Sequence, residues 1–281
     1  MSDRAVAPVS APPFIAEAQA LLVRLAATQA DALEKASQWC ATAIAGDGLV
    51  HLFGTGHSRI PLEEMFPRYG SYPGFNPIAD LSMTFHTQVV GANGQRQAMF
   101  IERTPGLAEV ILDNFAFGQK DVLIVFSAGG TTAVPVEMAR GGRRRGLRVI
   151  AVTSVAQSMS SDVDPVVGSR LLDEADLVID LCTPPADALI TIDGLDTPVG
   201  PGSTVTAVAI VNSIKVRTAE LLVERGVMPP VITRASVVGA ERSRDLFDAA
   251  YREHSRRLAR AIDRGSGRSG QGARQEVSET A

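Results

Sequence analysis

The sequence predicts an α/β fold in which helices cover both faces of a parallel sheet, a doubly wound arrangement. Strand-like and helix-like patterns alternate along most of the 281 residues. Apolar runs such as 122–126 and 149–153 do not alternate with polar residues, which indicates strands that are buried on both faces. Turns rich in Gly, Ser and Thr follow two of these strands, at the edge of the sheet where such folds bind ligands.

The expected elements follow one another in a regular order. Over 14–45, apolar residues recur at steps of three and four, which predicts a long N-terminal helix that ends at Gly46-Asp47-Gly48. Strands are expected at 49–53, more weakly around 75–79, and then at 121–127, 148–153 and 177–181. Helices are expected at about 59–66, 105–116, 132–145 and 203–224. Pro105 is expected at the first position of the second of these helices.

Changes in composition predict where the segments begin and end. Residues 1–13 contain three prolines and are expected to be a flexible lead. The helix over 14–45 must bury its apolar stripe on the sheet domain or on a second subunit. The ligand-binding domain is expected to span 46–240 and a charged helix to follow over 241–263. The last segment, 264–281, is rich in Gly, Ser, Arg and Gln and is expected to be disordered.

Composition argues against several classes of protein. The formal net charge of −4 disfavours a nucleic-acid or membrane-surface partner, and no apolar run of about 18 residues predicts a membrane span. The two cysteines lie far apart and the N-terminus does not resemble a secretory signal, so a reduced, cytoplasmic protein is expected. The four histidines lack metal-ligand spacing, and neither GxGxxG nor a P-loop occurs. We therefore expect no metal and no other cofactor.

The two turns rich in Gly, Ser and Thr are the candidate ligand site. Each offers backbone N–H groups, hydroxyls and a helix N-terminus, which together attract an anion such as phosphate. Ordinary strand–helix turns are the alternative interpretation, but two hydroxyl-rich examples in one sheet favour a phosphorylated small molecule. The residues concerned are Gly56, His57 and Ser58 in the first turn and Ser127, Gly129, Gly130, Thr131 and Thr132 in the second.

Three segments resemble the SIS (sugar isomerase) domain family, over about residues 14–245. They are Phe53–Ser58, the run from Glu102 to Leu112, and Val199–Thr204 with Asn212. The similarity is to the group of SIS proteins that includes N-acetylglucosamine 6-phosphate dehydratase. This resemblance implies a five-stranded parallel sheet and a homodimer or larger homo-oligomer with a shared active site.

The resemblance also implies roles for single residues. It implies phosphate ligation by the hydroxyls of Ser58, Ser127 and Thr132. The chain departs from the family at Gly129, where a second serine is usual, so one hydroxyl is missing from the second turn. Ser203 and Thr204 match a ligand-contacting segment, although capping of the helix that follows explains them equally well.

Proton chemistry on a sugar phosphate needs a carboxylate or an imidazole. In the open-chain aldehyde the C2 proton is acidic, so a carboxylate close to C2 can remove it. Glu63 and Glu64 lie shortly after the first turn, where one should face the crevice, and Glu63 is slightly favoured. Both could equally be favourable charges near a helix N-terminus. The remaining candidates are Glu102 as base or acid, His86 in proton transfer, and Arg103 in substrate binding.

Three functions remain open at this stage. The first is dehydration of a hexosamine 6-phosphate, specifically N-acetylglucosamine 6-phosphate, by removal of the C2 proton and loss of the 3-hydroxyl. The second is aldose–ketose isomerisation, which begins with the same proton abstraction and ends with protonation at C1. The third is a sugar-phosphate sensor, which needs the phosphate turns but no base.

Overall fold

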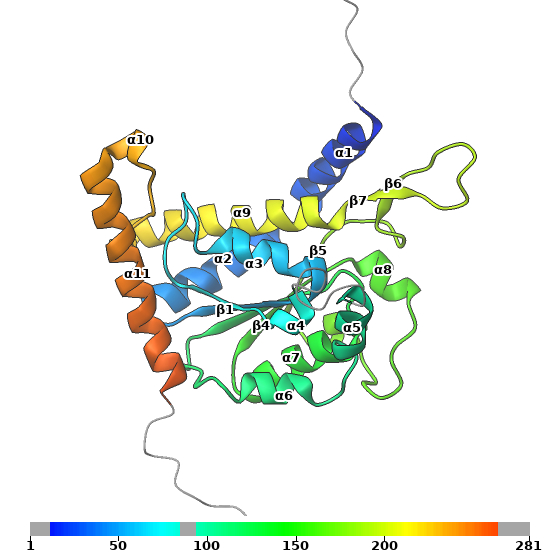
Figure 1. Cartoon of the computed structure of the whole chain (residues 1–281), viewed down its shortest axis with the longest axis horizontal. Helices are drawn as coiled ribbons and strands as arrows, with labels where there is room; N and C mark the ends of the chain where they lie inside the picture. Colours follow the sequence, from blue (N-terminus) through cyan, green and yellow to red (C-terminus); the bar gives the residue numbers. More distant parts are fainter. Residues whose placement is uncertain (1–11, 85–93, 264–281) are drawn as a thin grey trace, which may run out of the picture.

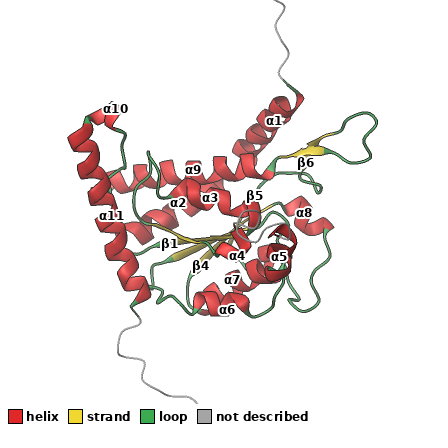
Figure 2. Ribbon diagram, in the orientation of Figure 1, coloured by secondary structure: helices red, strands yellow, loops and turns green. Residues whose placement is uncertain are grey.

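A five-stranded parallel sheet forms the centre of the molecule, and its strand order is β2-β1-β3-β4-β5 (Figures 1 and 2). The computed structural model describes residues 12–84 and 94–263. The five strands confirm the predicted fold class, and each lies within about two residues of its expected position. Their bounds are β1 Val50–Gly54, β2 Phe75–Ile78, β3 Val122–Phe126, β4 Arg148–Thr153 and β5 Leu177–Asp180.

Helices cover both faces of this sheet, as the buried apolar runs predict (Figure 1). One face packs against α2 (Ala30–Ala45) and α9 (Ser203–Glu224), and α3 (Ile60–Met65) packs on α9. The other face packs against α6 (Leu107–Leu112) and α7 (Ala133–Arg144). All five residues of β1 and of β3 are buried, so these two inner strands lie between two apolar cores.

The expected long N-terminal helix is two helices. The first, α1 (Pro13–Thr28), ends at Gln29, whose backbone leaves the helical conformation at φ −111° and ψ 6°. The side-chain oxygen of Gln29 accepts a hydrogen bond of 2.9 Å from the backbone N–H of Asp180 in β5. This contact fixes the break beside the sheet. On the N-terminal side of this break, α1 extends away from the sheet and contacts β6 (Ala188–Ile190) (Figure 1). Strand β6 pairs with β7 (Val199–Pro201) in a projecting hairpin.

The helix expected over 105–116 is shorter than predicted. It is α6, which begins at Leu107 because Gly106 precedes it with φ +84°, a conformation that no helix contains. Pro105 is therefore not its first residue. Several short elements were not predicted. They are the two strands of the projecting hairpin, α4 (Leu81–Thr84), α5 (Gly94–Ile101), α8 (Val155–Ser160), α10 (Ala235–Val238) and the 3-10 turns η1 (Gly56–Arg59) and η3 (Leu171–Asp173).

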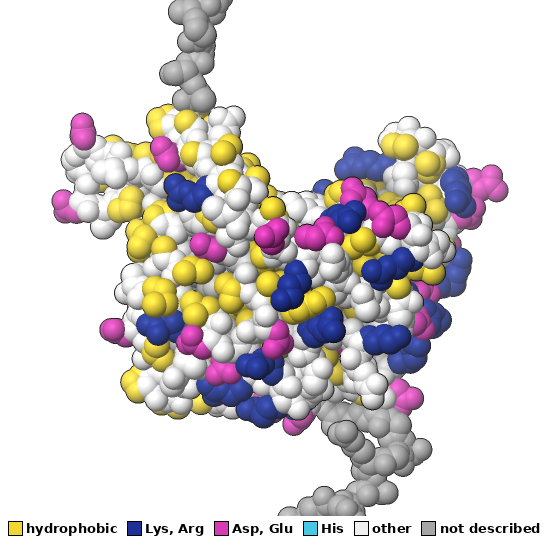
Figure 3. All heavy atoms as spheres, turned by 180° about the vertical axis from the view of Figure 1, so that it is seen from behind, with side chains coloured by type: hydrophobic (Ala, Val, Ile, Leu, Met, Phe, Trp, Pro, Cys, Tyr) yellow, Lys and Arg dark blue, Asp and Glu magenta, His cyan; other side chains and the backbone are white. Residues whose placement is uncertain are grey.

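The expected charged helix near the C-terminus is α11 (Ala240–Ile262). It lies across the end of the sheet opposite to the turns that carry the candidate site (Figure 1). Charged residues of both signs are interspersed on the face seen in Figure 3, and neither sign dominates it. The expected flexible lead, apart from its last two residues, and the expected disordered tail fall outside the described residues. No described helix combines the length and apolar composition that crossing a bilayer requires.

Candidate functional site

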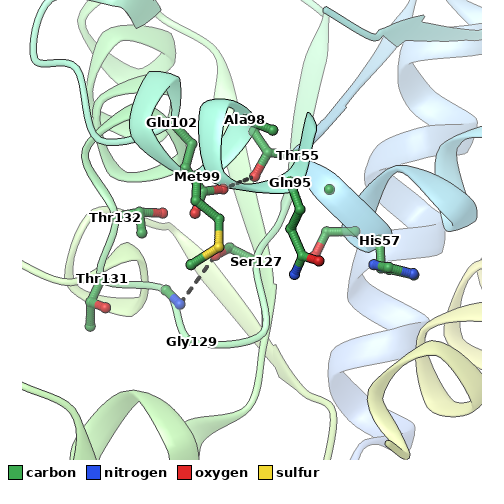
Figure 4. A pocket seen from close by; sticks show the side chains of 13 residues that line it. Thr55, His57, Gln95, Ala98, Met99, Glu102, Ser127, Gly129, Thr131 and Thr132 are labelled. Carbon is green, nitrogen blue, oxygen red and sulfur yellow. Dashed lines mark hydrogen bonds between the residues drawn. The ribbon is translucent and has the colours of Figure 1, made fainter. Parts of the chain in front are cut away.

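The two predicted turns meet at the carboxyl ends of the neighbouring strands β1 and β3. The first continues as η1 and the second runs into α7. They line one cavity of about 230 Å³, shown in Figure 4. Every turn residue predicted from the sequence lies on its wall: Gly56, His57, Ser58, Ser127, Gly129, Gly130, Thr131 and Thr132.

Much of the polar lining is free to bind a ligand. Within the described part of the chain, no hydrogen bond engages the hydroxyls of Ser58, Thr131 and Thr132. Ser127 differs, because its hydroxyl oxygen accepts a hydrogen bond of 3.2 Å from the backbone N–H of Gly130. Helix α7 begins directly after Thr132, which lines the cavity, and no side chain caps it, so the positive end of its dipole lies beside the wall. The wall therefore suits an anion with several oxygens, such as a phosphate group.

The shape of the second turn depends on Gly130. Its φ is +61°, and a Cβ there would lie 2.8 Å from the Thr153 hydroxyl. Gly129, where the family usually has serine, is less constrained, since a Cβ would meet only the Gln157 amide at 3.6 Å. The missing hydroxyl at this position therefore has no steric cause.

Glu102 is the candidate carboxylate that reaches the cavity. It follows the end of α5, and its side chain is 19% exposed. The Thr55 hydroxyl donates a hydrogen bond of 2.6 Å to Glu102 Oε2, which Figure 4 marks with a dashed line. The backbone carbonyl of Glu102 accepts a hydrogen bond of 2.9 Å from the N–H of Val134, in the first turn of α7. These contacts join the carboxylate of Glu102 to the first turn and its backbone to the start of α7.

Within one chain, Glu63 and Glu64 do not lie on the wall of this cavity, contrary to the expectation that one of them faces it. The turn η1 lies between the loop and α3, and it directs α3 onto α9 instead. Glu63 is 56% exposed, and its carboxylate lies 3.6 Å from Arg59 Nε.

Glu64 belongs to a different cluster, between α3 and α9. Its carboxylate accepts hydrogen bonds from Asn212, at 2.9 Å, and from Arg68. Burial alone would raise the pKa of Glu64, but these hydrogen bonds outweigh it and hold the pKa below its ordinary value. The ammonium of Lys215 donates to the Glu64 carbonyl at 2.8 Å, and burial lowers the pKa of Lys215.

The remaining candidates have different positions. Arg103 is not among the residues that line the cavity, and its guanidinium Nη1 lies 3.7 Å from Glu102 Oε1 and donates to the backbone carbonyl of Met99 at 2.6 Å. His86 lies outside the described residues. In the same described part, no group of three metal-ligating side chains is arranged to hold a metal ion.

Ser203 and Thr204 line a second cavity, of about 170 Å³, which adjoins the first. The Ser203 hydroxyl donates to Asp187 Oδ2 at 2.7 Å, and Asp187 Oδ1 accepts from the backbone N–H groups of Gly202 and Ser203. Ser203 is thus held at the start of α9 by a carboxylate from the segment before β6. The sequence reasoning missed Asp187, because nothing local links it to a residue 16 positions later.

The sequence reasoning also missed Gln95 and Met99, which lie across the mouth of the first cavity (Figure 4). Both are on α5, a helix that was not predicted. Thr55 was part of the predicted first turn, but its contact with Glu102 joins residues 47 positions apart. Such contacts follow from the folded arrangement and leave no local signal.

Comparison with known proteins gives consistent matches. The SIS domain family model matches residues 13–154. A UPF0309 protein of Streptomyces avermitilis is 31% identical over 247 residues, covering 87% of this chain and 95% of that protein. A UPF0309 protein of Listeria innocua is 32% identical over 233 residues, covering 83% and 92%. Among solved structures, a phosphoheptose isomerase from Francisella tularensis matches at 13% identity and a TM-score of 0.46, covering 74% and 95%.

Proposed function

Because the chain belongs to the SIS domain family, among the UPF0309 proteins, we propose that it is an enzyme acting on a sugar phosphate. The specific reaction we propose is dehydration of N-acetylglucosamine 6-phosphate. One observation carries the proposal: the hydroxyl-rich turns and the carboxylate of Glu102 line the same cavity. A phosphate anchor and a base within one cavity suffice for chemistry at a carbon next to a carbonyl.

The phosphate ester binds at the second turn, between the free hydroxyls of Thr131 and Thr132 and the N-terminus of α7. The carbon chain then extends toward Thr55 and Glu102. The Thr55 hydroxyl holds one carboxylate oxygen, which fixes the orientation of the base before the substrate arrives.

Each proton has a defined path in the reaction. The Glu102 carboxylate accepts the C2 proton of the open-chain aldehyde, and the C2–H electron pair forms an enolate with the C1 carbonyl. When the enolate collapses, the C3–O bond breaks, and protonated Glu102 returns the proton to the departing hydroxyl. The products are a 2,3-unsaturated aldehyde phosphate and one water molecule. In a sugar phosphate that carries a hydroxyl at C2, the same proton abstraction would form an enediolate, whose protonation at C1 would instead give a ketose.

The test is incubation of the purified protein with N-acetylglucosamine 6-phosphate in D2O. We expect a product lighter by one water, with the ultraviolet absorbance of a conjugated aldehyde. Deuterium at C2 without water loss would show proton exchange alone and contradict dehydration. Binding without any exchange at C2 would contradict the enzyme proposal and favour a sensor.

Substitution of the base tests the role of Glu102 separately. We expect Glu102→Gln to lower the turnover rate by about 10²- to 10⁴-fold, the usual contribution of a general base, with substrate binding retained. Glu63→Gln, an equivalent change at an exposed carboxylate outside the cavity, should leave turnover near the wild-type rate. Loss of turnover in Glu63→Gln together with normal turnover in Glu102→Gln would instead assign the base to α3. The side chain of Glu63 would then reach the cavity from a second subunit of the homodimer that the family resemblance implies.

A further inference from the structure

The second cavity shares part of its wall with the first. His57, Ser58 and Ser127 line both, so a ligand held at the second turn has an open neighbouring space beyond these three residues. The two cavities differ in chemistry. The first is lined mainly by hydroxyls, backbone amides and a carboxylate, whereas half of the second wall is apolar. The apolar residues are Pro61, Phe126, Ala128, Val152, Leu181 and Ala207.

The polar groups of the second cavity offer little free charge. The Asp187 carboxylate accepts three hydrogen bonds from the start of α9, and the positive end of that helix further compensates its charge. Thr204 is different, because its hydroxyl makes no hydrogen bond to any residue the structure describes. The cavity therefore combines an apolar wall with the free hydroxyl of Thr204, and the hydroxyls of Ser58 and Ser127 lie on the wall that it shares with the first cavity.

We propose that the second cavity is the subsite for an acylamino substituent at C2 of the sugar phosphate. This inference rests on the proposed function, and it identifies Ala207 and Thr204 as the residues that determine specificity. The methyl group of an acetamido substituent would pack against Leu181 and Ala207, and its carbonyl oxygen would accept a hydrogen bond from Thr204.

Other C2 substituents fit this cavity less well. A hydroxyl group would leave the apolar wall without contact and would gain no burial of apolar surface. An ammonium group would need a carboxylate partner, and Asp187 already accepts three hydrogen bonds from the start of α9, with which the ammonium would compete. Burial of an ammonium beside Leu181 and Ala207 without such a partner is costly.

Binding of hexitol 6-phosphates tests the subsite without turnover, because these compounds lack the carbonyl that the reaction requires. The ligands are N-acetylglucosaminitol, glucosaminitol and glucitol 6-phosphate, each titrated calorimetrically, with inorganic phosphate as a fourth. We expect the wild-type protein to bind the acetamido compound at least about tenfold more tightly than the other two hexitols, a factor typical of a filled apolar pocket.

Two variants remove this preference in different ways. Ala207→Leu fills the cavity and should weaken the acetamido compound by about tenfold or more. Thr204→Val keeps the shape but removes the hydroxyl, and should weaken it by roughly two- to tenfold. Both variants should change the affinity for glucitol 6-phosphate by no more than about twofold, because its C2 hydroxyl does not fill the second cavity. Val223→Leu on the exposed side of α9 is the control and should change none of these affinities.

The outcomes separate the two proposals. Equal wild-type affinity for the acetamido and hydroxyl compounds, or tighter binding of the amino compound, would overturn the subsite and leave the proposed function intact. The subsite proposal would also be overturned if Thr204→Val and a folded Ala207→Leu protein both kept the full preference for the acetamido compound. If none of the sugar phosphates binds, the proposed function fails and the subsite fails with it.

Discussion

Two adjacent glycines in the second turn have different reasons to be glycine. Gly130 adopts φ +61°, and an added Cβ would press against the Thr153 hydroxyl. Both the backbone conformation and the available space therefore exclude a side chain there. Gly129 lies outside the left-handed region, and a Cβ there would make only ordinary contacts, so the fold does not require glycine at this position.

We expect opposite effects from substitutions at these two positions. Gly130→Ala should destabilise the turn by about 2 kcal/mol, because the left-handed backbone and the close contact both penalise a Cβ. It should also abolish binding of hexitol 6-phosphate. Gly129→Ser should fold normally and tighten that binding by about threefold, because it adds a hydroxyl donor beside the phosphate. Urea unfolding and calorimetric titration measure the two effects, and equal losses at both positions would contradict this account.

The site could be predicted from the sequence in part. The phosphate turns were predictable because their glycines and hydroxyls are contiguous, and the chemistry of a strand–helix turn is local. The choice of carboxylate was not predictable. Glu63 and Glu64 are close to the first turn in sequence, yet α3 packs on α9 and removes both from the cavity. Glu102 reaches it through α5, a helix that sequence periodicity did not indicate.

At the scale of elements, the sequence predicted long buried segments well and breaks poorly. The strands were identified because runs such as 122–126 have no polar face. The break at Gln29 was missed because no Gly or Pro marks it, and its stabilising contact comes from Asp180 in a distant strand. The short helix α8 depends on a local cap, in which the Ser154 hydroxyl accepts from the N–H of Gln157.

Helix α11 is held to the body by buried polar contacts as well as by apolar packing, in which the Phe66 ring lies against His254. Only Ala250, Arg257 and Ala261 are buried along its length. The guanidinium of Arg257 is 6% exposed and donates to the backbone carbonyls of Ile44 and Gly48, at 3.0 and 2.8 Å. These carbonyls lie at the turn between α2 and β1, so Arg257 joins the C-terminal helix to the start of the sheet.

Replacement of Arg257 should therefore be far more costly than replacement of its neighbour. Arg257→Met leaves the Gly48 carbonyl without its side-chain donor and removes one donor each from the Ile44 carbonyl and the Glu253 carboxylate, and it should lower the free energy of unfolding by about 3 kcal/mol. Arg256→Met removes an ion pair of a half-exposed side chain with Asp47 and should cost less than about 1 kcal/mol. Urea denaturation followed by circular dichroism compares the two, and similar midpoints would show that the buried contacts do not hold α11.

Across the whole molecule, ionised carboxylates connect segments that are distant in sequence. Hydrogen bonds from Arg217 on α9 hold the pKa of Glu34 on α2 below its ordinary value. Hydrogen bonds from Arg256 likewise lower the pKa of Asp47 and of Glu253. The contact with Asp47 connects α11 to the body, and the contact with Glu253 lies within α11. The same direction holds for Glu64, Asp121 and Glu174, where polar partners outweigh burial. Protonation of these groups weakens the contacts between layers.

This distribution predicts loss of stability in acid. Each carboxylate has a lower pKa when folded than its unfolded value of about 4, so the unfolded chain binds more protons as the pH falls below that value. The urea midpoint should therefore decline from about pH 5 to pH 3 and continue to fall toward the folded pKa values. Asp47→Asn should be less stable than the wild type at pH 7 but lose less between pH 5 and pH 3, because one of the responsible groups is gone. A midpoint that stays constant over this interval would mean that these ion pairs contribute little to the folded state.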